Sequence, residues 1–189
     1  MIKWKNIPLI FPIILNSLIF IITSAEAQSQ SQTQSEDIEQ TEEVRNEFGN
    51  WLQVCKKETE KCVALQFALN IQGEKAARFV LERLIQSAEN PANSIVTFFI
   101  PFESSIPLLH SGLSFRVDAN EPFFEQFLFC DQLGCTSQFG ITEKGIDLLK
   151  QGANLTIQIN DIRDSKSSYI MDLDLDQFIK IYDKLAVKN

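Results

Sequence analysis

Large apolar side chains recur at every second position along several stretches of this chain, and this period most constrains how it can fold. Residues 63–69, 113–117 and 155–159 show the alternation, and residues 79–85 follow it with one interruption. Successive side chains of a strand point to opposite faces of a sheet, so the pattern is typical of antiparallel strands with one buried face. Residues 95–100 are apolar nearly throughout, as expected of a central strand. The pattern predicts an all-β fold, mainly antiparallel, arranged as a sandwich or a barrel.

Two short helices interrupt the strands. Thr142 is placed to cap a helix that runs through Leu149 and stops at Gly152. A second helix, beginning at Asp174 or Asp176, carries an apolar stripe and lies at the C-terminal end of the chain. Such a terminal helix either covers its own sheet or docks a partner. The 15 phenylalanines supply ample side-chain volume for a core.

The N-terminal segment has the three parts of an export signal. Two lysines precede the apolar stretch 7–22, and Ala25 and Ala27 then give the small-x-small pattern that a signal peptidase accepts. The competing interpretation is an uncleaved anchor, but a spanning helix needs about 20 apolar residues, and this stretch is shorter and contains two prolines. We predict a cleavable signal peptide over residues 1–27, and therefore no integral membrane span after cleavage.

The rest of the chain divides into a spacer and one domain. Residues 28–47 are rich in Gln, Ser and Glu, and we interpret them as a polar linker. Residues 48–189 are predicted to form a single β domain. The chain carries a net charge of −8, which disfavours nucleic acid and anionic lipid as partners because phosphates would be repelled.

The four cysteines form two close pairs in the sequence, Cys55 with Cys62 and Cys130 with Cys135. Three connectivities are possible, and local pairing is favoured if each pair faces across a hairpin. A zinc site is the competing interpretation, but it needs cysteine pairs of the C-x2-4-C type with compatible partner ligands. Here the two cysteine spacings are unequal, and the chain has one histidine. Export leads to an oxidising compartment. We therefore predict two disulfides and no metal site.

A search for catalytic groups identifies none. The single histidine, His110, is next to Ser111 in sequence, but adjacency does not make a catalytic dyad. Asp172, Asp174 and Asp176 alternate with leucines as in a calcium loop, yet the required glycine and terminal glutamate are missing. We predict that the protein is not an enzyme and uses no cofactor.

Several motifs, in order, resemble the invasion-associated locus B family. The block Phe48-Gly49-Asn50-Trp51 precedes the first cysteine pair, the segment 111–118 follows, and the second cysteine pair leads into the helix 142–152. The resemblance covers about residues 48–185. Ser105 departs from it, because the family often has glycine there.

This resemblance implies an exported all-β domain of alphaproteobacteria, named for a role in the entry of pathogens into host cells. We expect a non-enzymatic envelope or secreted protein that supports host-cell interaction or invasion, and hence virulence. The alternative is a periplasmic housekeeping or small-ligand-binding module. The expected partner is a host-cell surface or bacterial envelope component, and the expected location is the periplasm, the outer membrane surface or the medium. The oligomeric state is left open.

Overall fold

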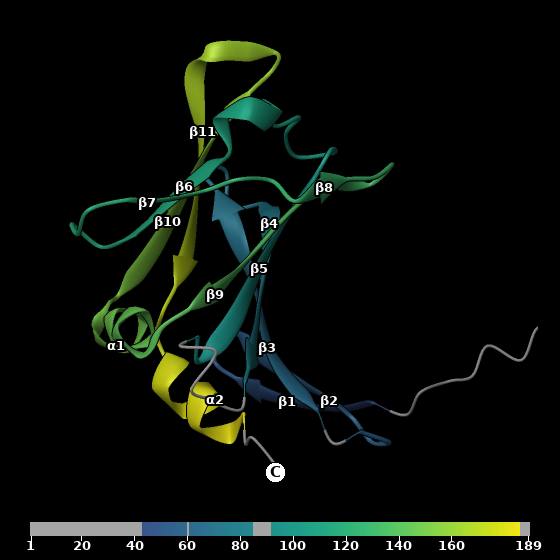
Figure 1. The fold of residues 1–189 in the computed structure, drawn as a ribbon, viewed down its shortest axis with the longest axis vertical. Helices are drawn as coiled ribbons and strands as arrows, with labels where there is room; N and C mark the ends of the chain where they lie inside the picture. Colours follow the sequence, from purple (N-terminus) through teal and green to yellow (C-terminus); the bar gives the residue numbers. More distant parts are fainter. Residues whose placement is uncertain (1–42, 60, 85–91, 186–189) are drawn as a thin grey trace, which may run out of the picture. The chain divides into compact units, whose positions relative to one another are not determined.

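A computed structural model describes residues 43–59, 61–84 and 92–185 of the chain (Figure 1). The predicted signal peptide, and residues 28–42 of the predicted linker, lie outside the described residues. Within the described part, no helix has both the length and the apolar character needed to cross a membrane.

The described residues form one antiparallel sheet with two α-helices and one 3-10 turn. The elements are β1 (Glu43–Phe48), β2 (Trp51–Lys56), β3 (Cys62–Asn70), β4 (Lys75–Arg83), β5 (Ser94–Pro101), η1 (Leu109–Ser111), β6 (Leu113–Val117), β7 (Phe123–Glu125), β8 (Phe129–Cys130), β9 (Gly134–Ile141), α1 (Glu143–Gln151), β10 (Asn154–Asp161), β11 (Asp164–Asp174) and α2 (Phe178–Lys184).

The strand order explains how the sheet curls. It runs β7-β6-β10-β11-β3-β4-β5-β9-β8, with β2 also paired to β3 and β1 to β2. The outermost strands of this order, β7 and β8, are joined only by the short segment Gln126–Leu128. Within that segment, Leu128 N donates to Thr136 O at 2.7 Å, and the Gln126 carbonyl accepts from the Ser137 hydroxyl at 2.8 Å. So short a connection holds the two edges near each other. The sheet therefore forms a curled half-barrel, which confirms the predicted all-β class with two helices, one of them C-terminal.

The core fills the inside of this curled sheet. Its centre is aromatic: Phe79 packs edge-on against both Trp51 and Phe98, with ring centroids 5.7 and 5.3 Å apart. Helix α2 adds Phe178, whose ring lies 5.3 Å from Trp51, and α1 adds Ile146. Both helices lie at the same end of the sheet, at the bottom of Figure 1.

The period-two pattern predicts the buried face correctly in most strands. In β10 the side chains of Leu155, Ile157 and Ile159 are all buried, and β6 buries its own apolar residues in the same way. In these strands the apolar set lies inside and the intervening polar set lies outside, as expected of a sheet with one buried face.

Strand β3 does the opposite, and this corrects our expectation that its larger residues form the buried face. Ala64, Gln66 and Ala68 are buried, whereas Phe67 and Leu69 are 38% and 41% exposed. Since the inner side of β3 faces the rings of the aromatic core, small side chains suit this position. The large side chains of β3 are consequently on the outside of the sheet.

Strand β1 begins at Glu43, inside the segment we predicted to be linker up to residue 47. Phe48 pairs with Trp51 across a two-residue turn in which Gly49 has a φ of +61°. Glycine at the first turn position is the requirement of a type II′ hairpin, which matches the twist of the flanking strands. Side chains from Glu43 to Glu47 are exposed, so no buried apolar pattern marks this strand in the sequence. The pairing with β2 through backbone hydrogen bonds forms it.

The helices differ from the sequence prediction at their ends. Helix α1 follows Thr142 and ends at Gly152, but the Thr142 side chain makes no capping hydrogen bond. Gly152 is extended rather than left-handed, and a Cβ atom there would lie 2.1 Å from a methyl carbon of Val117. Close packing therefore requires this glycine. Helix α2 starts only at Phe178, and its apolar residue Ile179 is 50% exposed rather than buried.

Candidate functional site

The cysteines form the disulfides Cys55–Cys62 and Cys130–Cys135. Each bond joins two strands of a hairpin, β2 to β3 and β8 to β9, at directly opposed positions. The Cα atoms are 4.0 Å apart in both. No free thiol remains, since all four cysteines lie in the described part. The disulfides fit an exported protein and stabilise hairpins rather than supply chemistry.

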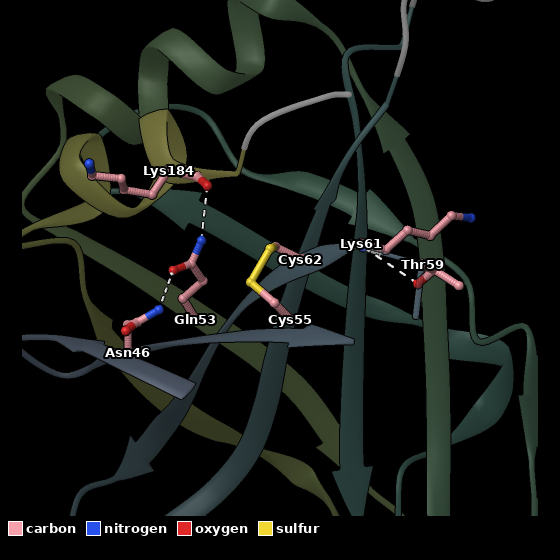
Figure 2. Close-up of a disulfide and its surroundings, with 7 residues drawn as sticks. All are labelled: Asn46, Gln53, Cys55, Thr59, Lys61, Cys62 and Lys184. Carbon is pink, nitrogen blue, oxygen red and sulfur yellow. Dashed lines mark hydrogen bonds between the residues drawn. A yellow bond between two sulfur atoms is a disulfide. The ribbon is translucent and has the colours of Figure 1, made fainter. Parts of the chain in front are cut away.

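Figure 2 shows how the first of these hairpins is attached to the C-terminal helix. The buried side chain of Gln53 donates to the carbonyl of Lys184, at the end of α2, at 2.9 Å. Asn46 on β1 donates in turn to the Gln53 side chain at 3.0 Å. These bonds connect β1, β2 and α2.

The residues considered for catalysis or metal binding are not brought together. His110 lies exposed in η1, and its side chain makes no hydrogen bond or ion pair with the described residues. Asp172 accepts a hydrogen bond from Thr156 at 2.7 Å, and Asp174 accepts from the Asp176 amide at 2.8 Å. Nowhere in the described ranges do three His, Cys, Asp or Glu side chains gather as metal ligands would.

Among the described residues, the carboxyl group whose pKa is shifted most is that of Asp161, at the end of β10. It accepts from the Ser105 hydroxyl at 2.7 Å, from the Ile106 amide at 3.3 Å and from the Arg163 guanidinium at 2.5 Å. The Arg163 guanidinium, aided by the Ser105 hydroxyl, holds the pKa of Asp161 well below its usual range, against the opposing effect of burial.

The Asp161 cluster is structural. It attaches the loop after β5 to the end of β10, next to a β-bridge between Pro107 and Asp161. Ser105 is fully buried, and its hydroxyl is used in this cluster. The Ser105 side chain thus binds Asp161 and links the loop after β5 to β10.

A pocket of about 250 Å³ lies inside the curled sheet beneath α1. Its walls come from β4, β5, β6, β7, β9, β10 and α1. The lining residues are Phe79, Val96, Phe98, Phe115, Val117, Phe123, Glu125, Phe139, Gly140, Ile141, Thr142, Lys144, Gly145, Leu148, Leu149 and Leu155.

Phenylalanine rings form most of one wall of this pocket. Phe115 is stacked between Phe139 and Phe123, with ring centroids 5.2 and 5.4 Å away. Phe98 packs at a tilt against both Phe115 and Phe139. Stacked rings present apolar faces of fixed orientation. This wall can therefore hold an apolar ligand with little rearrangement.

The polar side chains of the lining come from β7 and the start of α1. They are Glu125, Thr142 and Lys144. Glu125 is half-buried and has no hydrogen-bond or ion-pair partner among the described residues, and burial raises its pKa. Lys144 is exposed on the first turn of α1. The pocket thus combines an apolar lining with a few polar groups, a combination common in small-molecule sites.

No local sequence motif marks this pocket. Its phenylalanines come from five different strands, and we interpreted them as core. Only the curling of the sheet, which brings its two edges near each other, places Phe115 on β6 against Phe139 on β9. The one available signal was the unusual number of phenylalanines, 15 in the chain.

A second feature lies on the outer side of the sheet, which we call the outer apolar face. It consists of the outward side chains Leu52, Leu65, Phe67, Val80, Phe99 and Phe129 on β2, β3, β4, β5 and β8. Arg78 on β4 lies between Phe67 and Phe99, and Thr136 on β9 lies between Phe99 and Phe129. Two cations accompany the rings: Lys75 Nζ lies 4.5 Å from the centre of Phe67, and the Arg78 guanidinium 5.1 Å from that of Phe99. Across β6, β10 and β11, by contrast, the outer side is mostly polar, with Ser114, Thr156, Gln158 and Asp172.

Comparisons with known proteins match this chain to one family and to solved structures. The profile of the family described as "Invasion associated locus B (IalB) protein" matches residues 51–186. The crystal structure of invasion-associated protein B from Bartonella henselae superposes with a TM-score of 0.60 at 15% identity, covering 75% of this chain and 95% of that one. At this identity the structural match shows a shared fold. A search of curated proteins finds no match.

Proposed function

The chain belongs to the invasion-associated locus B family, and we propose that it is an exported, non-enzymatic protein that supports contact between a bacterium and a host cell. The name of the family supports this role, and the two disulfides fit the export it requires. The family is not a known enzyme family. The periplasm, the outer membrane surface and the medium are the locations we propose.

The observation that carries the proposal is the outer apolar face. Phe67 is 38% and Phe129 52% exposed, and they lie in the same cross-strand row as Phe99, with Arg78 and Thr136 between the three rings. Exposed apolar patches mark interaction sites on soluble proteins, and aromatic side chains and arginine are enriched in protein–protein interfaces. The host-cell partner we propose is therefore a protein surface.

The test compares two outward positions of similar exposure. Phe67→Ser removes a ring from the outer apolar face, and Ile170→Ser is the matched control, because Ile170 is 42% exposed and its cross-strand neighbour is Gln158. A deletion strain complemented with each variant is assayed for host-cell adhesion and entry. We expect Phe67→Ser to lower both, by roughly three- to tenfold, as for an interface residue worth about 1 kcal/mol, and Ile170→Ser to leave them unchanged. A deletion strain that enters host cells normally would refute the role.

The predicted export and the predicted cleavage of the signal peptide are both tested on protein from the secreted or periplasmic fraction. Mass spectrometry of the purified protein should give an N-terminus at Gln28 and no free thiol. Retention of the first 27 residues would contradict cleavage, and recovery in the cytoplasm alone would contradict export.

A second function, a small-ligand-binding module of the cell envelope, is favoured by the pocket beneath α1. It predicts that the deletion strain shows envelope stress in culture without host cells. An unaffected envelope under detergent and osmotic challenge would count against it.

A further inference from the structure

The size of the pocket limits its ligand to a small molecule. Its volume of about 250 Å³ exceeds that of an apolar cavity of about 150 Å³ that binds benzene. It falls just below the range of about 300 to 1,000 Å³ in which drug-sized ligands bind. A single ring or a short alkyl chain fits these limits.

The lining indicates an apolar body for that ligand. Phe79 and Phe98 line the pocket from inside the core and are almost fully buried, and Leu149 closes it from α1. None of these side chains can pair with a polar group, so polar atoms placed among them would lose hydrogen bonds to water. The polar part of a ligand has to lie at Glu125 or at the start of α1, where the polar side chains of the lining are.

Two charged side chains, Glu125 and Lys144, line the pocket, and they differ in how freely they can move. Glu125 is on strand β7, whose backbone is paired to Leu113 in β6, and its carboxylate is half-buried without a partner. Lys144 is exposed, and its long side chain can place the ammonium in water. A ligand carboxylate would set a second negative charge beside Glu125, whereas an ammonium or hydroxyl group would give Glu125 the donor that it lacks.

We infer that the pocket beneath α1 binds a small amphiphile with an alkyl or aryl body and a hydrogen-bond-donating head, an amine or an alcohol, held by Glu125. This inference rests on the second proposed function, ligand binding. It adds the chemical class of the ligand and the residue that selects it. Phe123, 45% exposed and stacked on Phe115, lies at the opening beside Glu125 and covers the ligand body.

The experiment titrates the processed, disulfide-bonded protein with octylamine, octanol and octanoate, each below the concentration at which it forms micelles. The three compounds share one tail and differ in the head. Isothermal titration calorimetry should give binding of octylamine and octanol, with octanoate about tenfold weaker. Preference for octanoate would overturn the inference.

Glu125→Gln tests the selecting residue, and Glu143→Gln is its matched control, because Glu143 is exposed on α1 and does not line the pocket. Glu125→Gln should weaken octylamine about tenfold and bring octanoate to within about twofold of octanol. Glu143→Gln should leave all three affinities unchanged. If Glu125→Gln has the same small effect as Glu143→Gln, Glu125 does not select the ligand.

Leu148→Trp tests the place of binding. Leu148 is half-buried and lines the pocket from α1, so the larger ring should fill the space and weaken all three compounds at least tenfold. Circular dichroism and thermal unfolding show whether this variant is folded, and Glu125→Gln gives an independent result if it is not. Failure of all three compounds to bind the unaltered protein would refute ligand binding itself. Equal binding of all three would refute only the inferred head group.

Discussion

Strands β3 and β10 carry the same alternation of large and small or polar side chains, but they turn opposite sets toward the core. β10 buries Leu155, Ile157 and Ile159 and exposes Gln158. β3 buries its alanines and leaves Phe67 38% exposed. The difference comes from what each strand faces.

The surroundings of the two strands explain these opposite orientations. β3 lies next to β4, whose Phe79 projects inward and forms part of the aromatic centre. Ala68 lies opposite Ala77 in β4, and both are buried, so a larger side chain at either position would overpack the core. β10 lies between β6 and β11, and Ile157 pairs with Phe115 and Met171, where the core has space for large aliphatic groups. Alternation thus predicts a strand, and the neighbours decide which set of side chains faces inward. This comparison gives four predictions about the free energy of unfolding.

The largest effect is expected for the inward face of β10. Ile157→Ala should lower the free energy of unfolding by about 2–5 kcal/mol, because Ile157 is fully buried and the truncation leaves a cavity. Urea unfolding monitored by Trp51 fluorescence measures it. The outward control Gln158→Ala should change stability by less than about 0.5 kcal/mol. Equal losses in the two variants would contradict the orientation of β10.

The second-largest effect is expected at the end of β10, where Asp161 binds Arg163 and Ser105. Asp161→Asn should lower the free energy of unfolding by about 1.5–3 kcal/mol at neutral pH, since it weakens charge-assisted hydrogen bonds to Arg163 and Ser105. The unaltered protein should lose the same contribution in acid. The pKa of Asp161 is lowered in the folded state, so the stabilisation is present above the unfolded pKa of about 3.9 and is lost as the pH falls below it.

Urea unfolding at a series of pH values tests this dependence. The stability difference between the unaltered protein and Asp161→Asn should shrink as the pH falls below about 4. A difference that stays constant from neutral pH into acid would show that the carboxylate of Asp161 is not the source of the stabilisation.

The inward face of β3 should resist enlargement. Ala68→Leu should cost about 1–3 kcal/mol by overpacking, because Ala68 is fully buried opposite Ala77. Urea unfolding measures the loss, and Ala119→Leu in the exposed turn after β6 is the control, expected near zero. A stabilising Ala68→Leu would mean that the small residues of β3 do not face the core.

The smallest effect is expected on the outward side of β3. Phe67→Ser should change the free energy of unfolding by no more than about 1 kcal/mol, because the ring already contacts water and loses mainly its contact with Lys75. The same denaturation measurement applies. A loss larger than that of Ala68→Leu would reverse the assignment of the two faces.

Much of the fold could be predicted because its signals are local. The alternation in residues 113–117 and 155–159 predicts β6 and β10 together with their buried faces, and the helix following Thr142 was placed nearly correctly. β1 could not be predicted, since its exposed residues carry no apolar period and the strand depends on pairing with β2.

The candidate site was much less predictable than the fold. Glu125 and Lys144 are ordinary surface-type residues in the sequence, and only the approach of β7 to α1 makes them neighbours of one pocket. The Asp161 cluster likewise joins residues 56 positions apart, Ser105 and Asp161, and no motif marks that pair.

The sequence by itself determined the all-β class, the strands with a repeating period, the two cysteine pairs and the family, because each of these depends on residues near one another in the chain. The tertiary structure alone decided which face of β3 is buried, how the edges β7 and β8 meet, and where the pocket forms. The physical reason is that a period of two fits either face of a strand equally well. Only the volume offered by neighbouring strands, distant in sequence, selects one of them.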